Sequence, residues 1–405
     1  MGDLVIREIA GAVTAPAGFT AAGIAAGIKK HGNPDVALIA GDGDCAAAAV
    51  FTINKAKAAP VLLSMMNLEA SGGRAQAIVA NAGCANACTG EQGAADAYEM
   101  ASLTASLLGC APEEVLVAST GVIGVNLPMD KVRAGIEQAS AARAADGGEL
   151  ASLAIMTTDP FPKARAIACT LADGRTFRVG GIAKGSGMIE PRMATMLAFL
   201  TTDVAIEPPV LQRALVQAVD VTFNAITVDG ECSTNDCVFA LASGASGTAI
   251  RESDVDQFVA ALVDVAGFLA REIVRGGEGA TKLVAITVSG AATEHDAWLA
   301  ARTIANSPLV KTAIHGGDPN WGRLVAAAGR SGAAFILERT SVSIGGIELF
   351  VKGRPHDERS DAAAVVLQAT EIEIAVDLGM GTHAATMWTC DFSADYVRIN
   401  AEYRT

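Results

Sequence analysis

Two stretches of the chain combine hydroxyl side chains with glycine turns, as an acyl-transfer site would require. The segment 184–200 reads KGSGMIEPRMATMLAFL, in which small Ala194 precedes the hydroxyl-bearing Thr195 and a proline upstream blocks helix continuation. The segment 119–124 reads STGVIG and follows an apolar run. A glycine turn at a strand end can present backbone N–H groups and a hydroxyl to a developing negative charge, as an oxyanion hole does. The residues alone leave simpler interpretations open, in which Thr195 caps a following helix and the second stretch is an ordinary turn.

Other signatures of chemistry are weak or absent from the sequence. Polar loops occur at FNAITVDGECSTND and at HGGDPNWGR, where HGGD alone is a weak metal signal. The phosphate-loop, dinucleotide-binding, HExxH and GxSxG patterns are missing. The five histidines stand singly, which disfavours a histidine-based triad without excluding one. The two close cysteine pairs lack CxxC spacing, so we predict buried thiols and no metal site. These pairs are Cys84 with Cys88 and Cys232 with Cys237.

Composition and charge exclude several classes of protein. The chain has 405 residues, of which 51% are hydrophobic and 18% charged, and its formal net charge is -14. This composition disfavours disorder, and the acidic balance argues against nucleic acid or an anionic membrane surface as a partner. No apolar run approaches the length of about 18 residues that a membrane helix needs, and Asp3 stands where a signal peptide would carry basic residues. We therefore expect a cytoplasmic protein.

Apolar runs typical of strands alternate with helical patterns, which predicts a layered α/β or α+β architecture. Aromatic residues make up only 4% of the chain, so the core must be built from small side chains packed closely together. The apolar run after Thr195 is interpreted as a buried helix. From residue 283 onward the pattern becomes strand-rich. The expected strands are 35–40, 77–81, 114–118, 165–170 and 176–183, and the expected helices are 91–108, 128–145, one beginning near Pro209, 253–275 with Ser253 as N-cap, and stretches around 296–313 and 359–369.

Seven motifs in order give the chain a resemblance to a known family. They are CAAAAVFTINKAKAAPV, NAGCANACTG, ASTGVIG, AKGSGMIEPRMATMLAFLTTD, FNAITVDGECSTND, HGGDPNWGR and INAEYRT. In them the sequence resembles the ArgJ family, which is the ornithine acetyltransferase or glutamate N-acetyltransferase of the cyclic arginine pathway. The resemblance implies an α+β layered, αββα-type sandwich of the DmpA/ArgJ-like fold with a smaller, strand-rich C-terminal α/β domain. The chain departs from the family pattern at Arg192, where Asn is usual, and at Cys232 and Cys237.

The resemblance also implies that the chain cuts itself between Ala194 and Thr195. The products would be an α chain of residues 1–194 and a β chain of residues 195–405, assembled as an α2β2 heterotetramer. The expected packing units are 1–280, which spans the cleavage site, and 283–390, with 391–405 returning to the active site.

An N-terminal threonine would explain acyl transfer without a histidine. Once free, Thr195 carries a nucleophilic Oγ and an α-amino group, whose unperturbed pKa of about 7.7–8.0 suits a base near neutrality. The resemblance implies a ping-pong cycle in which Thr195 takes acetyl from N-acetylornithine, releases ornithine and passes acetyl to glutamate to give N-acetylglutamate. No external cofactor is needed. The residues leave open whether acetyl-CoA is a second donor.

Individual site residues follow from their positions in the motifs. Thr120 and Gly121 resemble the family's oxyanion pair, one offering a hydroxyl and the other a backbone N–H. Lys184 can pair with a substrate α-carboxylate, and Glu278 can attract the cationic amine of ornithine. The substrate-binding positions implied by the resemblance are Thr158, Lys184, Thr195, Glu278, Asn400 and Thr405.

Two alternative functions remain at this point. An amidase or aminopeptidase with an N-terminal nucleophile would give the acyl group to water in place of glutamate. A pseudo-enzyme or an assembly subunit would keep the fold without cutting itself. The HGGDPNWGR and INAEYRT motifs favour the acetyltransferase over the hydrolase.

Overall fold

The computed structural model describes residues 4–190 and 196–402 and divides the chain into two compact units. The first unit contains Met1–Asn224 and Glu231–Ile273, and the second contains Ala225–Gly230 and Val274–Thr405. The first unit therefore includes chain from both sides of residues 191–195.

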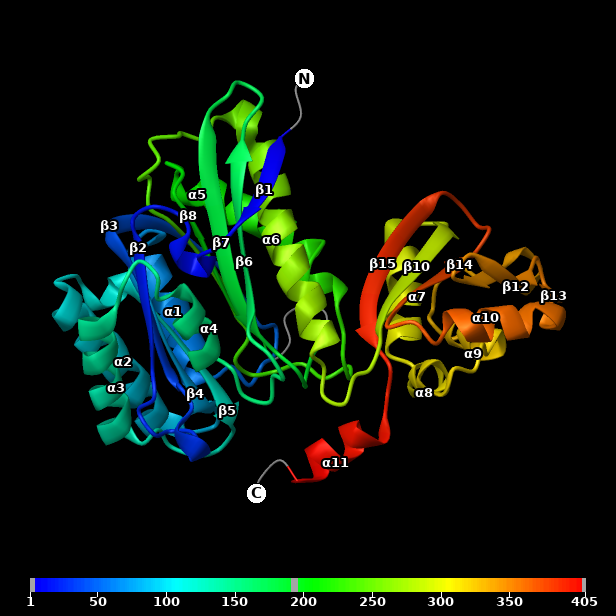
Figure 1. Ribbon diagram of the computed structural model, residues 1–405, viewed down its shortest axis with the longest axis horizontal. Helices are drawn as coiled ribbons and strands as arrows, with labels where there is room; N and C mark the ends of the chain where they lie inside the picture. The colour runs from blue at the N-terminus through cyan, green and yellow to red at the C-terminus, as the bar shows by residue number, and fades with distance from the viewer. Residues whose placement is uncertain (1–3, 191–195, 403–405) are drawn as a thin grey trace. The chain divides into compact units, whose positions relative to one another are not determined.

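The first unit is built on nine strands that form two β layers joined by one long strand, β3 (Val36–Phe51). β3 pairs with β2 (Phe19–Ile24) in its first half, with β4 (Arg74–Cys84) as far as Ala46, and with β9 (Cys237–Ala242) from Ala46 to Phe51. The register with β4 shifts between Ala40 and Cys45, and shortly after this shift β3 leaves β4 and continues beside β9 (β3 and β4 are labelled in Figure 1). The strand order is β1-β6-β7-β8-β9-β3-β4-β5, and the remaining strands are β1 (Val5–Ile9), β5 (Val115–Val122), β6 (Lys163–Thr170), β7 (Thr176–Lys184) and β8 (Leu197–Thr202).

Alternate residues of the central strands face two different cores. In β3, Ala37 and Ile39 pack between the two β layers in one cluster with Phe199 of β8. The intervening Leu38 packs on the outer side in a cluster with Met100 of a covering helix. Because side chains alternate along a strand and both faces are covered, such strands appear in the sequence as continuous apolar runs.

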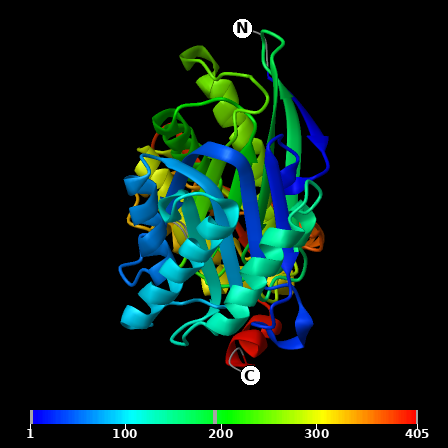
Figure 2. The same ribbon diagram turned by 90° about the vertical axis from the view of Figure 1, so that its left-hand side faces the viewer.

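Helices cover the outer faces of the two β layers. On one side, α2 (Gly90–Leu108) and α3 (Met129–Ala142) share a core with β3, β4 and β5, and Figure 2 looks onto these cyan helices. On the other side, α6 (Val255–Arg275) packs its Val265 and Leu269 side chains against Gly181 of β7. The order helix, sheet, sheet, helix confirms the predicted αββα sandwich. The remaining helices of this unit are α1 (Ala59–Ala70) against β5, α4 (Gly148–Ala154) against β2, and α5 (Pro208–Asp220) against β3.

The second unit holds a six-stranded sheet with the order β13-β12-β11-β14-β10-β15. β10 (Leu283–Ala291) pairs in parallel with β14 (Glu371–Asp377) and antiparallel with β15 (His383–Cys390). In β14 buried and exposed residues alternate, so one face of the sheet packs on the core of this unit. Its other elements are β11 (Ser341–Ile344), β12 (Ile347–Val351), β13 (Arg354–Pro355), α7 (Glu294–Ala305), α8 (Pro308–Gly316), α9 (Trp321–Gly329), α10 (Ser360–Val366) and α11 (Ala394–Glu402).

The expectation of a buried helix after Thr195 was wrong. Residues 197–202 form β8, which pairs antiparallel with β7 and parallel with β9. All six residues are buried because the strand has neighbours on both sides and is covered on both faces. A short, continuous apolar run has no periodicity that separates a helix from such a strand. With a strand in this place, the simple helix-capping role for Thr195 is excluded.

Two other boundaries also differ from the expected ones. The helix expected at 296–313 is two helices, α7 and α8, because Pro308 has no N–H to continue the first helix and begins the second. Ser253 is not the N-cap of α6, since it lies within a 3-10 turn, Glu252–Asp254, that precedes the helix. Among the described residues, no helix is both long and apolar enough to cross a membrane.

Candidate active site

The predicted oxyanion pair lies at the end of β5, beside an irregular part of the sheet. Thr120 is buried, and Gly121 lies opposite Gly83 of the parallel strand β4. The register shifts at the next residue, so that Cys84 pairs with both Thr120 and Val122. A Cβ at position 121, where φ is +130°, would come 2.3 Å from the carbonyl carbon of Gly83. Only glycine fits there, and the shift in register takes its backbone out of the regular ladder.

Lys184, the last residue of β7, joins Thr120 in one buried cluster. Its Nζ lies 3.2 Å from Thr120 Oγ1 and 2.7 Å from Thr157 Oγ1. Lys184 and Thr120 are each only 2% exposed. An ammonium group can only donate, so Thr120 Oγ1 accepts from Lys184 and keeps its own proton to donate to another group. The fold thus brings together two predicted site residues that are 64 positions apart in the chain.

Asp159, the residue after the predicted Thr158, holds this cluster in place, although no sequence pattern singled it out. Its Oδ1 accepts from Lys163 Nζ at 2.6 Å and from the backbone N–H of Gly185 at 2.7 Å. Its Oδ2 accepts from the N–H of Thr157 at 3.0 Å. Burial alone would raise the pKa of this carboxyl, but the charges of Lys184 and Lys163 hold it at about 2. Asp159 is therefore an ionised group that fixes both Thr157 and the residue after Lys184.

Thr158, the predicted substrate-binding residue, lies between Thr157 and Asp159 but is itself exposed. The hydroxyl that meets Lys184 belongs to Thr157. Within the first unit, the contact with Lys184 is therefore made by the residue next to the predicted Thr158.

Asn235, in the polar loop before β9, connects the oxyanion strand to the rest of the site. Its Nδ2 donates to the carbonyl oxygen of Ser119 at 2.9 Å and to that of Ala85 at 2.6 Å. Ser119 Oγ in turn donates to Asn81 Oδ1 at 2.6 Å. Because all of these groups are buried, the bonds hold the backbone on both sides of the β4–β5 irregularity.

Asp236 anchors the chain at Met196, the first described residue after the proposed nucleophile. Its Oδ1 accepts from the backbone N–H of Met196 at 2.8 Å, and the residue is fully buried. Burial raises the pKa of Asp236 well above its usual range, against the opposing effects of the Met196 N–H and the charge of Lys184. The shift favours the protonated acid. Within the described ranges Asp236 Oδ2 has no hydrogen-bond partner.

Four residues singled out from the sequence lie outside the described residues. They are Arg192, Ala194 and Thr195, which fall in 191–195, and Thr405, which falls in 403–405.

Glu278 and Asn400 come together within the second unit. Asn400, on α11, donates from Nδ2 to Glu278 Oε2 at 2.8 Å, and Glu278 is 7% exposed. The first turn of α11 is tied down by Tyr396, whose hydroxyl donates to Asp229 Oδ2 at 3.2 Å. The preceding Ser393 Oγ donates to the carbonyl oxygen of Gly279 at 2.6 Å. These bonds fix the helix that carries Asn400 beside the turn that carries Glu278.

The HGGDPNWGR motif serves as a connection between α8 and α9. Gly317 ends α8 with a φ of +70°, and Asn320 caps α9 by accepting from the N–H of Arg323 at 3.1 Å. His315 pairs through Nδ1 with Asp391 Oδ2 at 2.7 Å. Nowhere in the described ranges do three His, Cys, Asp or Glu side chains gather as a metal ion would require.

The prediction of buried thiols is correct for most but not all of the cysteines. Cys88, which lies just before α2 and has a φ of +58°, is exposed. No disulfide joins any two cysteines of the described chain. The buried ones are Cys45, Cys84, Cys169, Cys237 and Cys390.

The chain is similar over nearly its whole length to one family of proteins. The model of the ArgJ family matches residues 20–405. The arginine biosynthesis bifunctional protein ArgJ of Symbiobacterium thermophilum is 52% identical over 402 residues, which are 98% of this chain and 99% of that protein. The protein of the same name from Synechococcus sp. is 51% identical over 411 residues, with 98% and 99% covered. The crystal structure of ornithine acetyltransferase complexed with ornithine from Mycobacterium tuberculosis is 45% identical with a TM-score of 0.42, over 46% of this chain and 98% of that chain.

Proposed function

Because the chain belongs to the ArgJ family, we propose that it is the acyltransferase of arginine biosynthesis that moves acetyl from N2-acetyl-L-ornithine to L-glutamate. The structural observation that carries the proposal is the buried contact of 3.2 Å between Lys184 Nζ and Thr120 Oγ1. A buried ammonium beside a hydroxyl and a glycine N–H is suited to stabilise the negative charge of a tetrahedral intermediate.

Maturation would begin with attack of Thr195 Oγ on the carbonyl carbon of Ala194. The amide C–N bond breaks, its nitrogen becomes the α-amino group of Thr195, and an ester joins Ala194 to Thr195 Oγ. Water then hydrolyses the ester, which leaves a carboxylate on Ala194 and a free Thr195 hydroxyl. The bond from Met196 N–H to Asp236 supports this assignment, because it fixes the chain one residue after the nucleophile.

The two products of cleavage would remain joined by the sheet of the first unit. β8 and β9 belong to the 195–405 product, yet they lie between β7 and β3 of the 1–194 product. Breaking the chain at 194 leaves those strand pairs unchanged. We expect the matured chains to stay associated and assign them the α2β2 assembly that the family resemblance implies.

In the transfer reaction the free α-amino group of Thr195 would accept the proton of its own hydroxyl as Oγ attacks the acetyl carbonyl. Thr120 O–H and Gly121 N–H would donate to the resulting oxyanion, and Lys184 keeps the Thr120 proton directed away from itself. Collapse expels ornithine, whose amine takes the proton back and leaves an acetyl ester on Thr195. The amine of glutamate then attacks this ester, releases N-acetylglutamate and restores the hydroxyl.

Glu278 is assigned to the cationic side-chain amine of ornithine, and Asn400 to the orientation of the Glu278 carboxylate. One solved relative is complexed with ornithine, and we assign the same ligand to this chain. Thr158, Lys184 and Thr405 are assigned to the polar ends of the substrates. The curated relatives are called bifunctional, so glutamate acetylation from acetyl-CoA is the second activity to assay.

Incubation of the purified protein with N-acetylornithine and glutamate tests the proposal. We expect ornithine and N-acetylglutamate in equal amounts, and neither product with Thr195→Ala. Release of free acetate without N-acetylglutamate would instead identify an amidase of the same fold. Since free amino acids are the substrates, we expect the enzyme to work in the cytoplasm.

A further inference from the structure

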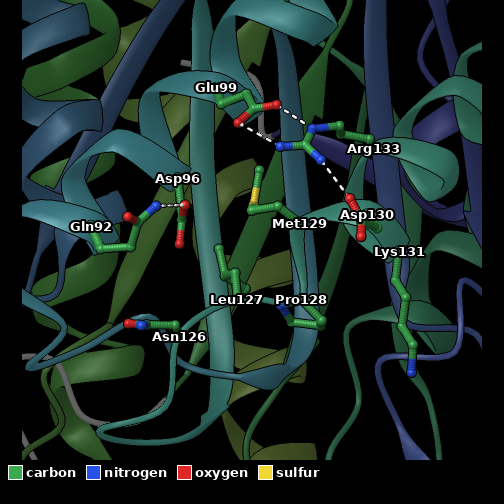
Figure 3. A pocket seen from close by; sticks show the side chains of 10 residues that line it. All are labelled: Gln92, Asp96, Glu99, Asn126, Leu127, Pro128, Met129, Asp130, Lys131 and Arg133. Carbon is green, nitrogen blue, oxygen red and sulfur yellow. Dashed lines mark hydrogen bonds and ion pairs between the residues drawn. The ribbon is translucent and has the colours of Figure 1, made fainter.

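A pocket of about 530 Å³ lies in the first unit between α2, α3 and the loop that leads from β5 into α3 (Figure 3). Glutamine and acidic side chains of α2 line one wall, and acidic and basic side chains of α3 line the other. Asn126 and Leu127 of the loop line the space between the two helices. These residues have no role in the acetyl transfer proposed above.

The cations of the pocket are already engaged by other groups. Arg133 binds both carboxylate oxygens of Glu99, through Nε and through Nη2 at 3.2 Å, and its Nη1 lies 2.8 Å from Asp130 Oδ1. Lys131 Nζ donates to the carbonyl oxygen of Gly27 at 2.6 Å. The Arg133 guanidinium thus pairs with both Glu99 and Asp130. The third carboxylate of the pocket, Asp96, pairs with no cation among the described residues.

Asp96 is a buried carboxylate with one oxygen unused. It is 2% exposed, and its Oδ1 accepts from Gln92 Nε2 at 2.7 Å. Its Oδ2 is buried and has no hydrogen-bond partner in the described parts of the chain. Figure 3 shows this oxygen pointing away from Gln92, toward the side of the pocket formed by Asn126 and Leu127. A buried acceptor without a donor has lost its hydration without replacement, which is unfavourable unless a ligand supplies the donor.

We propose that this pocket binds a small organic cation whose N–H groups bind Asp96 Oδ2. An alkylammonium or a guanidinium supplies both the charge and the N–H donors that the carboxylate lacks. A metal ion fits less well, because no cluster of three metal-ligating side chains occurs among the described residues. Gln92 and Asn126 are exposed side chains, so either can move aside to admit a ligand to the buried oxygen.

The pocket is connected to the oxyanion pair through a short piece of backbone. The loop that carries Asn126 follows β5, which ends at Val122, one residue after Gly121. Cys84, which pairs with Thr120, also donates through Sγ to the carbonyl oxygen of Val125 at 3.0 Å. A ligand that moves the loop at Asn126 is therefore expected to change kcat, and the site would regulate the enzyme. Binding itself does not depend on the proposed acetyl transfer.

Isothermal titration of the full-length protein with putrescine, an alkylammonium, and with agmatine, which adds a guanidinium, tests the proposal. We expect one of them to bind, and Asp96→Asn to weaken that binding about tenfold or more, since a hydrogen bond to a charged group is lost. Asp130→Asn is the matched control: its carboxylate lines the same pocket but is fully exposed, and the variant should bind within about twofold of wild type. Glu278→Gln should also bind normally, which separates this pocket from the proposed substrate site.

Asn126→Lys provides a second variant that removes no buried side chain. Its tethered ammonium would compete for Asp96, so binding should again fall about tenfold even if Asp96→Asn does not fold. The proposal is overturned if neither amine binds the wild-type protein, or if Asp96→Asn folds and binds as wild type does. It is also overturned if Glu278→Gln alone abolishes the binding, because the amine then occupies the substrate site.

Discussion

Replacing Gly121 by alanine should remove most of the acetyl-transfer activity. The added Cβ would lie 2.3 Å from the carbonyl carbon of Gly83 and 2.6 Å from the backbone nitrogen of Cys84. Both are backbone atoms, so the strand end at Gly121 must move instead of a neighbouring side chain. The φ of +130° adds strain of about 1–3 kcal/mol for a residue with a Cβ. Movement of the Gly121 N–H removes an oxyanion donor, which should lower kcat by about 10²–10³-fold.

Gly124→Ala provides a matched control for the backbone strain. Gly124 also has positive φ, +80°, and lies three residues farther along the chain, just after β5, but a Cβ there meets nothing within 4 Å. It should therefore keep kcat within about threefold of wild type while losing a similar amount of stability from strain. Both variants are assayed for acetyl transfer and checked by circular dichroism. If Gly121→Ala folds and its kcat equals that of Gly124→Ala, the Gly121 N–H is not an oxyanion donor.

Three further changes test other parts of the site. Asp159→Asn should lower the free energy of unfolding in urea by about 3–5 kcal/mol, because Lys163 is left as a buried cation. Since folding lowers the pKa of Asp159 from 3.8 to about 2, wild type should lose about 2 kcal/mol of stability as pH falls through that interval, and the variant should show a flatter acid limb. Asp236→Asn should mature normally because its amide oxygen still accepts from Met196 N–H, whereas Asp236→Leu should slow cleavage about tenfold, as followed on denaturing gels. An uncut Asp236→Asn would show that the carboxyl group is required for more than this hydrogen bond. Lys184→Met should lower kcat by about 10²-fold without changing the circular dichroism spectrum. If the variant keeps the kcat of wild type, Lys184 takes no part in the mechanism.

The layered fold was predictable from the sequence because its central strands are covered on both faces. Val36 to Ala40 is apolar at every position, as a strand between two cores must be. The same property led to the wrong prediction at β8, because Leu197–Leu200 is equally apolar and has no period that separates a strand from a helix. The second half of β3 was missed because it consists largely of alanine, which gives little strand signal.

The candidate site was only partly predictable, because its contacts join distant segments. Motif resemblance predicted roles for Thr120 and Lys184, and their contact of 3.2 Å is consistent with a shared role. It did not indicate that Thr157 contacts Lys184 in place of Thr158, because one step along a turn decides which hydroxyl faces Lys184. Asp236 also escaped notice, because its importance depends on burial and on the Met196 N–H, neither of which a sequence pattern records.

Mass spectrometry of the protein after incubation with N-acetylornithine, in the absence of glutamate, tests the account most directly. We predict two chains, of residues 1–194 and 195–405, with one acetyl group on the peptide that begins at Thr195. Addition of glutamate should remove that acetyl group and produce N-acetylglutamate. An uncut chain that still transfers acetyl, or an acetyl group carried on any other residue, would contradict the account.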